Sequence, residues 1–83
     1  MTKTSTFTDR IIKLERLQSS RYGNPRWLVS FAEHGAYKTN VDGQVGYGIE
    51  NRELHDGPVL ATVERIRGTE QVTHLKPAPE TGL

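Results

Sequence analysis

The sequence predicts a mainly β domain: a small five-stranded OB-like barrel with one short helix, in the order βββαββ. Three observations predict it. Short segments with alternating apolar and polar residues recur along the 83-residue chain. Glycine, proline and asparagine separate these segments, as they do in turns. One apolar stripe at helical spacing, formed by Val41, Val45 and Ile49, lies between the third and fourth segments.

The first strand is expected at Ile11–Leu17. Ile12 and Leu14 alternate before Leu17 breaks the period, which predicts a bulge or bend near Glu15. A helix over the same residues is the alternative, because three of the apolar positions also fit a helical spacing. The strand is preferred because everything that follows has the pattern of a sheet.

The second strand, expected over residues 27–32, has the clearest alternation, with aromatic and β-branched residues at every second position. It follows a turn at 19–25, where glycine and asparagine tolerate positive φ and proline blocks a helix. A tight turn at 33–35 leads to a third strand over 36–41. These segments predict two consecutive hairpins.

The short helix is expected to begin at Asp42, a good N-cap, and to end near Asn51. Glycines at 43, 46 and 48 would each cost such a helix about 1 kcal/mol relative to alanine. The helix is therefore expected to form only by packing against the sheet, with Gly46 and Gly48 permitting close approach.

The last hairpin is expected to pair a fourth strand, residues 59–66, with a fifth, residues 71–76. The predicted organisation is a flexible N-terminus over 1–9, where an edge strand could also start, one barrel domain over 10–77 and a disordered tail over 78–83. An SH3-like barrel is the alternative fold, and an open sheet with one packed helix comes third. No internal repeat was found.

The composition sets limits on location and chemistry. The chain has no cysteine, so neither disulfides nor thiolate zinc can stabilise it. It has no apolar run long enough to span a membrane and no signal-peptide pattern at its N-terminus, so a cytoplasmic location is expected. The net charge is only +1, although residues 1–27 are basic and residues 28–56 acidic. This balance argues against strong nonspecific phosphate binding.

Two short motifs carry a family resemblance. Tyr22-Gly-Asn-Pro-Arg26, an aromatic-rich strand and then Tyr47-Gly-Ile-Glu-Asn51 resemble small uncharacterised proteins of actinobacteria and their bacteriophages. The resemblance extends through Gly57-Pro-Val59 to the last hairpin. It implies a phage or mobile-element origin, and it implies no active site.

No group of residues predicts catalysis, a metal or a cofactor, so the chain is expected not to be an enzyme. The three histidines, at 34, 55 and 74, do not have the spacing of a metal site. The carboxylates at 50, 53 and 56 are interpreted as a solvated acidic rim. The glycine-rich stretch 43–48 lacks the lysine and hydroxyl residue of a phosphate-binding loop.

The candidate binding residues are basic and aromatic side chains around the turn at 19–25, with two further cations. Tyr22 is expected to be exposed, whereas Trp27 could belong to the site or to the core. The set predicts a macromolecule-binding module, with a host or phage protein as the favoured partner and single-stranded nucleic acid as the alternative. The candidate residues are Arg21, Tyr22, Arg26, Trp27, Lys38 and Arg67.

Overall fold

Six strands form one mixed sheet in the computed structural model, which describes residues 4–41 and 45–78. Two 3-10 turns, η1 (Val45–Tyr47) and η2 (Arg52–Leu54), connect the fourth strand to the fifth. The strands are β1 (Thr4–Asp9), β2 (Ile11–Leu17), β3 (Arg26–Phe31), β4 (Gly35–Thr39), β5 (Val59–Ile66) and β6 (Thr69–Pro77).

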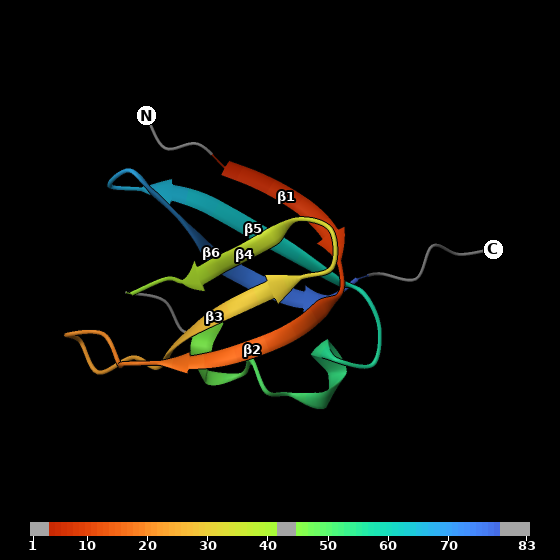
Figure 1. The fold of residues 1–83 in the computed structure, drawn as a ribbon, viewed down its shortest axis with the longest axis horizontal. Helices are drawn as coiled ribbons and strands as arrows, with labels where there is room; N and C mark the ends of the chain where they lie inside the picture. The colour runs from red at the N-terminus through yellow and green to blue at the C-terminus, as the bar shows by residue number, and fades with distance from the viewer. Residues whose placement is uncertain (1–3, 42–44, 79–83) are drawn as a thin grey trace.

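The strand order is β1-β5-β6-β4-β3-β2, so the two edge strands are consecutive in the chain. Arg10 alone separates β1 from β2, and the chain turns there from one edge of the sheet to the other (Figure 1). Neighbouring strands are antiparallel except β4 and β6, which pair in parallel over only two positions, Lys38 with Gln71 and Thr39 with Val72. The sheet is therefore strongly curved, with β2, β3 and β4 in front of β5 and β6 in Figure 1.

The prediction of a mainly β fold is confirmed, but its strand count is wrong. Thr4–Asp9, assigned by the sequence to the N-terminal segment, forms the additional strand β1 and pairs along its whole length with β5. The sheet is also not closed into a barrel, because no ladder joins β1 to β2. The strand expected at 11–17 is present, and its irregularity lies between Ile11 and Lys13 rather than at Glu15.

The predicted helix is also wrong. Its proposed start, residues 42–44, lies outside the described residues, and the described part forms 3-10 turns instead of an α-helix. The apolar stripe nevertheless faces inward, because Ile49 is fully buried and Val45 packs against the core. Packing against the core therefore places these two side chains. The glycines lower the helix propensity of the segment, so that a continuous α-helix does not form.

The core lies between the two layers of the curved sheet and is filled by alternate residues of the strands. Phe31 and Val63, both expected in the core, are 3% and 4% exposed. The Phe31 ring meets Phe7 edge to face at 5.0 Å, which attaches β1 to β3 across the interior. The 3-10 turns cover one end of this core with Ile49 and Leu54, as the green segments of Figure 1 show.

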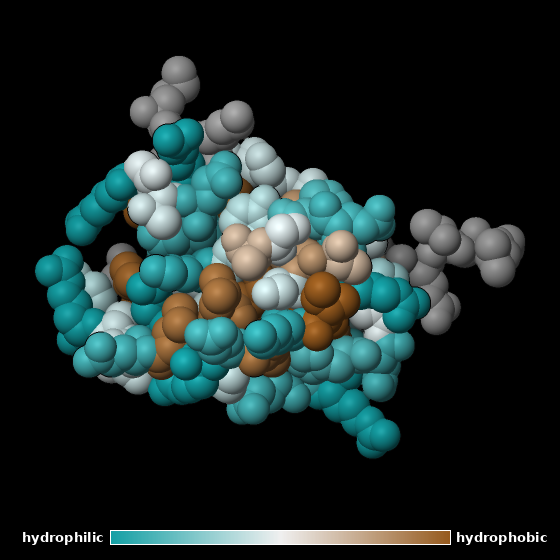
Figure 2. All heavy atoms as spheres, viewed as in Figure 1, coloured by the Kyte–Doolittle hydropathy of each residue, from teal (hydrophilic) through white to brown (hydrophobic). Residues whose placement is uncertain are grey.

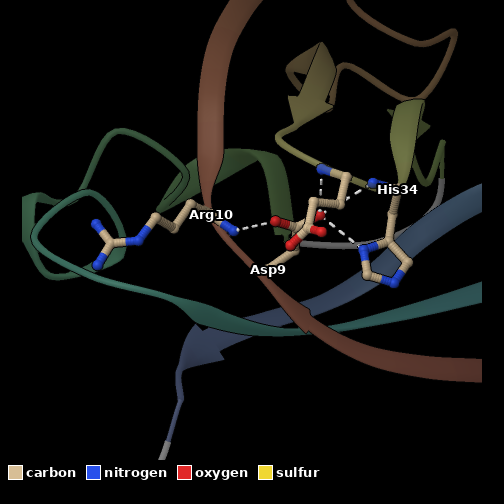
Figure 3. A network of polar contacts seen from close by, with 4 residues as sticks. Asp9, Arg10 and His34 are labelled. Carbon is tan, nitrogen blue, oxygen red and sulfur yellow. Dashed lines mark hydrogen bonds and ion pairs between the residues drawn. The ribbon is translucent and has the colours of Figure 1, made fainter.

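A buried carboxylate holds the bend between β1 and β2. Asp9 is 6% exposed and accepts hydrogen bonds from three backbone N–H groups, those of Arg10 at 2.7 Å, Glu33 at 2.8 Å and His34 at 3.0 Å. The His34 ring nitrogen Nδ1 lies 2.6 Å from the same carboxylate (Figure 3). Because a carboxylate only accepts, Nδ1 donates the proton. Asp9 therefore fastens the β3–β4 turn to the bend.

The same contacts determine the charge state of Asp9. Burial alone would raise the pKa of the carboxyl group, but the hydrogen bonds from the His34 ring and from the three N–H groups outweigh it. Together they lower the pKa of Asp9 from 3.8 to about 2. The Phe7 ring stacks on His34 at 4.0 Å, which fixes the imidazole in this position.

We predict that Phe31→Ala leaves the domain largely unfolded at room temperature. Removing a buried phenylalanine costs about 3–5 kcal/mol, and a domain this small has a total stability on the order of 5 kcal/mol. Urea unfolding followed by far-UV circular dichroism measures the effect. Ile12→Ala is the control, because Ile12 is 65% exposed. A cooperative transition of Phe31→Ala that matches the parent would show that this ring is not part of the core.

We also predict that Asp9 makes stability depend on acid pH. The folded pKa lies below the unfolded one, so the contribution of Asp9 is present above about pH 4 and disappears as the pH falls towards about 2. Asp9→Asn should be less stable at neutral pH and should lack this part of the pH dependence. Urea midpoints at neutral pH test the first statement, and urea midpoints between about pH 4 and about pH 2 test the second.

Glu33→Gln is the matched control for this prediction, since it removes a carboxylate but keeps the backbone N–H that binds Asp9. Its pH profile should retain the Asp9 contribution. If Asp9→Asn and the parent lose stability in parallel over this range, the carboxylate does not hold the bend.

Candidate macromolecule-binding surface

The candidate surface lies on the side of β2, β3 and β4 that faces away from the core. Val29 and Phe31 are buried, so the residues that alternate with them, and their cross-strand partners, point outward. We call this side the outer face. It consists of Lys13, Glu15, Leu17, Arg26, Leu28, Ser30, Ala36 and Lys38.

The centre of the outer face is aliphatic. Leu28 lies directly between Glu15 of β2 and Lys38 of β4, and Ala36 lies opposite Ser30. Figure 2 shows hydrophobic side chains gathered over β2 and β3 in this view, with hydrophilic side chains around them. The strands themselves carry no aromatic residue on this face, so any aromatic contribution must come from the flanking loops.

The loop between β2 and β3, residues 18–25, supplies a cation and an aromatic ring together. The Arg21 guanidinium lies 5.2 Å from the centroid of the Tyr22 ring, within cation–π distance. Tyr22 is 58% exposed, as the sequence predicted. Ser20 shapes the loop, because its carbonyl accepts from the Gly23 N–H at 2.8 Å and its N–H donates to the Asn24 carbonyl at 2.9 Å.

Arg26 and Lys38 both lie on the outer face, on neighbouring strands. The Arg26 guanidinium donates twice to the Thr39 carbonyl, from Nε at 3.1 Å and from Nη2 at 2.9 Å. This bidentate contact holds Arg26 against the end of β4 and leaves its remaining N–H groups for other acceptors. Lys38 is exposed on β4 and adds another cation to the outer face.

Trp27 points to the other side of the sheet. Its ring is half-buried and packs against the core, and its Nε1–H donates to the Gly46 carbonyl at 3.1 Å. The Arg16 guanidinium covers the ring at 5.5 Å from its centroid. Of the two roles that the sequence allowed for Trp27, the structure therefore favours packing, and Trp27 is not on the outer face.

Arg67 occupies the two-residue turn between β5 and β6. It has a φ of 52° and is followed by Gly68 at 81°, the left-handed pair that tight hairpin turns require. This turn and the loop 18–25 extend to the same side of the molecule in Figure 1, above and below the end of β4. Arg67 thus belongs to a second loop that flanks the outer face.

Sequence reasoning did not select Tyr47, which borders the same loop. Tyr47 is 63% exposed, and its hydroxyl donates to Asn24 Oδ1 at 3.2 Å. The Asn24 amide donates in turn to the Val41 carbonyl at 2.8 Å. Tyr47 lies in the glycine-rich stretch 43–48, which the sequence predicted to pack against the sheet. No sequence pattern indicated that this ring lies beside residues 18–25.

The fold separates the charges that nearly cancel in the whole chain. The outer face and its two flanking loops carry five basic side chains, Lys13, Arg21, Arg26, Lys38 and Arg67, against the single carboxylate of Glu15. Three exposed carboxylates lie instead in the 3-10 segment, at residues 50, 53 and 56, where Arg52 is the only cation. The candidate surface is therefore basic although the net charge of the chain is only +1.

The histidines and carboxylates do not converge on a metal site within residues 4–41 and 45–78. His34 binds Asp9, while His55 Nε2 lies 2.9 Å from the Ile49 carbonyl and His74 is exposed on β6. No helix in the described part of the chain is long and apolar enough to cross a membrane.

An open groove of about 900 Å³ lies apart from these residues, on β5, β6 and the 3-10 segment. Its lining mixes leucines with polar side chains, and its carboxylate, Glu64, already accepts from the Thr73 hydroxyl at 2.7 Å. None of the sequence-predicted site residues lines it. Searches of family models, curated proteins and solved structures found no match to this chain.

We predict that Gly46 is required to hold η1 against the loop. A Cβ atom there would overlap the Pro25 carbonyl oxygen, and Trp27 Cδ1 would be 3.4 Å away. Gly46→Ala should therefore lower the free energy of unfolding by about 1–3 kcal/mol. Gly48→Ala is the matched control, because nothing lies within 4 Å of its Cβ position. Equal urea midpoints for the two variants would contradict the close approach.

Proposed function

We propose that this chain is a non-enzymatic OB-like module that binds single-stranded nucleic acid through the outer face and its two flanking loops. The topology supports this. When β1 and β2 are counted as two halves of one bent strand, the neighbours follow the order 1-4-5-3-2-1 in a curled, incompletely closed sheet. OB-folds are partly open barrels that bind oligonucleotides on strands 2 and 3 with the loops 1–2 and 4–5. The equivalent elements here are β3, β4, residues 18–25 and residues 67–68.

The proposal rests on the exposed aromatic and basic side chains of the outer face and its flanking loops. An exposed tyrosine with an arginine beside it stands in the loop 18–25. The outer face and its two flanking loops together have a charge balance of +4. Single-stranded nucleic-acid sites combine a positive path for the phosphates with exposed rings on which bases stack. The low net charge of the chain does not argue against such a site, because the carboxylates of the 3-10 segment lie elsewhere.

A protein partner, of host or phage origin, is the second candidate function. The aliphatic centre of the outer face favours it, since Leu28 and Ala36 offer contact area but no stacking surface. The mobile-element origin and the cytoplasmic location stay predictions of the sequence. The two candidate functions use the same surface, so one experiment separates them.

We predict that a fluorescent single-stranded oligonucleotide of about 12 nucleotides binds this chain in a salt-dependent manner. Arg21→Ala, Lys38→Ala and Arg67→Ala should each weaken binding. Each should also reduce the slope of log K against log salt by about 0.7, because each removes one phosphate contact. Fluorescence anisotropy at several salt concentrations measures both quantities.

Arg52→Ala is the matched control for these variants. Arg52 is a fully exposed cation whose only partner among the described residues is Asp56, 4.0 Å away, and it lies on the acidic 3-10 segment. Its removal should change neither affinity nor slope. If the parent fails to bind even at low salt, nucleic-acid binding is excluded. Capture from a nuclease-treated lysate, with Leu28→Asp for comparison, would then test the protein partner.

A further inference from the structure

Two of the three strongly exposed large hydrophobic side chains among the described residues are tyrosines that border the loop 18–25. Tyr22 is part of this loop, and Tyr47 reaches it through Asn24. The third, Ile12, stands at the start of β2, away from the loop. Two of the six aromatic residues of the chain are therefore exposed rings at one loop.

Tyr47 is held in place from several directions. The backbone of Gly46 approaches the Pro25 carbonyl so closely that no side chain fits, and the Gly46 carbonyl accepts from Trp27 Nε1 at 3.1 Å. The Tyr47 hydroxyl is bound to Asn24 at 3.2 Å. Contacts to Pro25 and Trp27 thus hold the backbone of the preceding residue, and Asn24 holds the tip of the Tyr47 ring, while 63% of Tyr47 remains open to solvent.

A ring that is fixed but uncovered is preorganised for contact with a flat ligand. Aromatic rings stack with bases of any sequence, because every base has a π-face. In a duplex those faces are already stacked on neighbouring base pairs, so a pair of such rings selects unpaired nucleotides. The Arg21 guanidinium beside Tyr22 supplies the charge that a nearby phosphate requires.

We propose that Tyr47 is a second base-stacking platform beside Tyr22, so that the loop 18–25 binds at least two unpaired nucleotides of a single strand. This inference rests on the proposed function and adds to it a binding residue, a minimum ligand length and a preference for single strands over duplex. The outer face of the sheet, whose centre is aliphatic, does not by itself identify Tyr47 as a binding residue. It also does not show that Tyr22 and Tyr47 border the same loop.

The test uses the whole chain and a fluorescent oligothymidylate of about 12 nucleotides. Tyr47→Ala is expected to weaken binding by about 5-fold to 150-fold, the loss that corresponds to one stacked base. Its salt dependence should equal that of the parent, because no charge is removed. Tyr47→Phe retains the ring but loses the hydroxyl contact to Asn24, so it should bind more tightly than Tyr47→Ala and no more tightly than the parent. Ile12→Ala, which removes an exposed side chain away from the loop, is the control and should have no effect.

A second measurement does not depend on whether the variants fold. The unmodified protein is irradiated with an oligonucleotide that contains iodouracil, and the crosslinked peptides are mapped by mass spectrometry. Crosslinks at both Tyr22 and Tyr47 are the expected result. A duplex of the same sequence should compete weakly.

The outcomes separate this inference from the function on which it rests. If the oligonucleotide binds and depends on Arg21, but Tyr47→Ala keeps full affinity and no crosslink maps to Tyr47, the second platform is wrong and the proposed function stands. Equal affinity for duplex overturns the preference for single strands. If no oligonucleotide binds at low salt, the proposed function itself fails.

Discussion

The Asp9 carboxylate is the contact on which the arrangement of the sheet depends. The chain must leave the edge strand β1 and enter the opposite edge strand β2 within one residue, Arg10. Asp9 accepts from the N–H of Arg10 and from two N–H groups of the β3–β4 turn, and the His34 ring adds a fourth donor. One buried side chain therefore joins the bend to the hairpin that carries the outer face. Its lowered pKa reflects these bonds and marks a structural role, because all of its partners belong to its own fold.

The bend has a direct consequence for the candidate surface. Since β1 and β2 are consecutive but lie at opposite edges, β2, β3 and β4 form a layer in front of β5 and β6, and their outward side chains share one exposed face (Figure 1). The loop 18–25 and the turn at Arg67 extend beside this face. The 3-10 turns close one end of the core, and their segment carries three exposed carboxylates, at residues 50, 53 and 56. A chain with almost no net charge thus presents a basic surface on one side, which is the property that the proposed function requires.

Several contacts between segments distant in the sequence meet at the loop 18–25. Glycine at position 46 lets the backbone of η1 touch Pro25, and the Tyr47 hydroxyl donates to Asn24 of the same loop. Trp27 of β3 also donates to the Gly46 carbonyl. The half-buried Trp27 stabilises the loop from the core side, while Tyr22 and Tyr47 remain exposed. Rings and cations held in this way bind with less loss of conformational freedom than the same groups on a mobile loop would. The packing of the domain and the proposed binding surface therefore depend on the same few contacts.

The sequence by itself determined the β class, the strands at 11–17 and 59–66, the turns and the exposure of Tyr22, because alternation and turn residues act over a few neighbouring positions. It also grouped Arg21, Tyr22 and Arg26, which are close in the chain.

Only the tertiary structure decided the rest. Thr4–Asp9 has a weak local pattern and becomes a strand through its pairing with β5. Val45 and Ile49 were correctly expected to face the core, but the segment that contains them forms a pair of 3-10 turns instead of a helix. The Asp9–His34 contact and the approach of Tyr47 to Asn24 join residues about twenty-five positions apart. Such contacts follow from the path of the chain through space, which local sequence patterns do not specify.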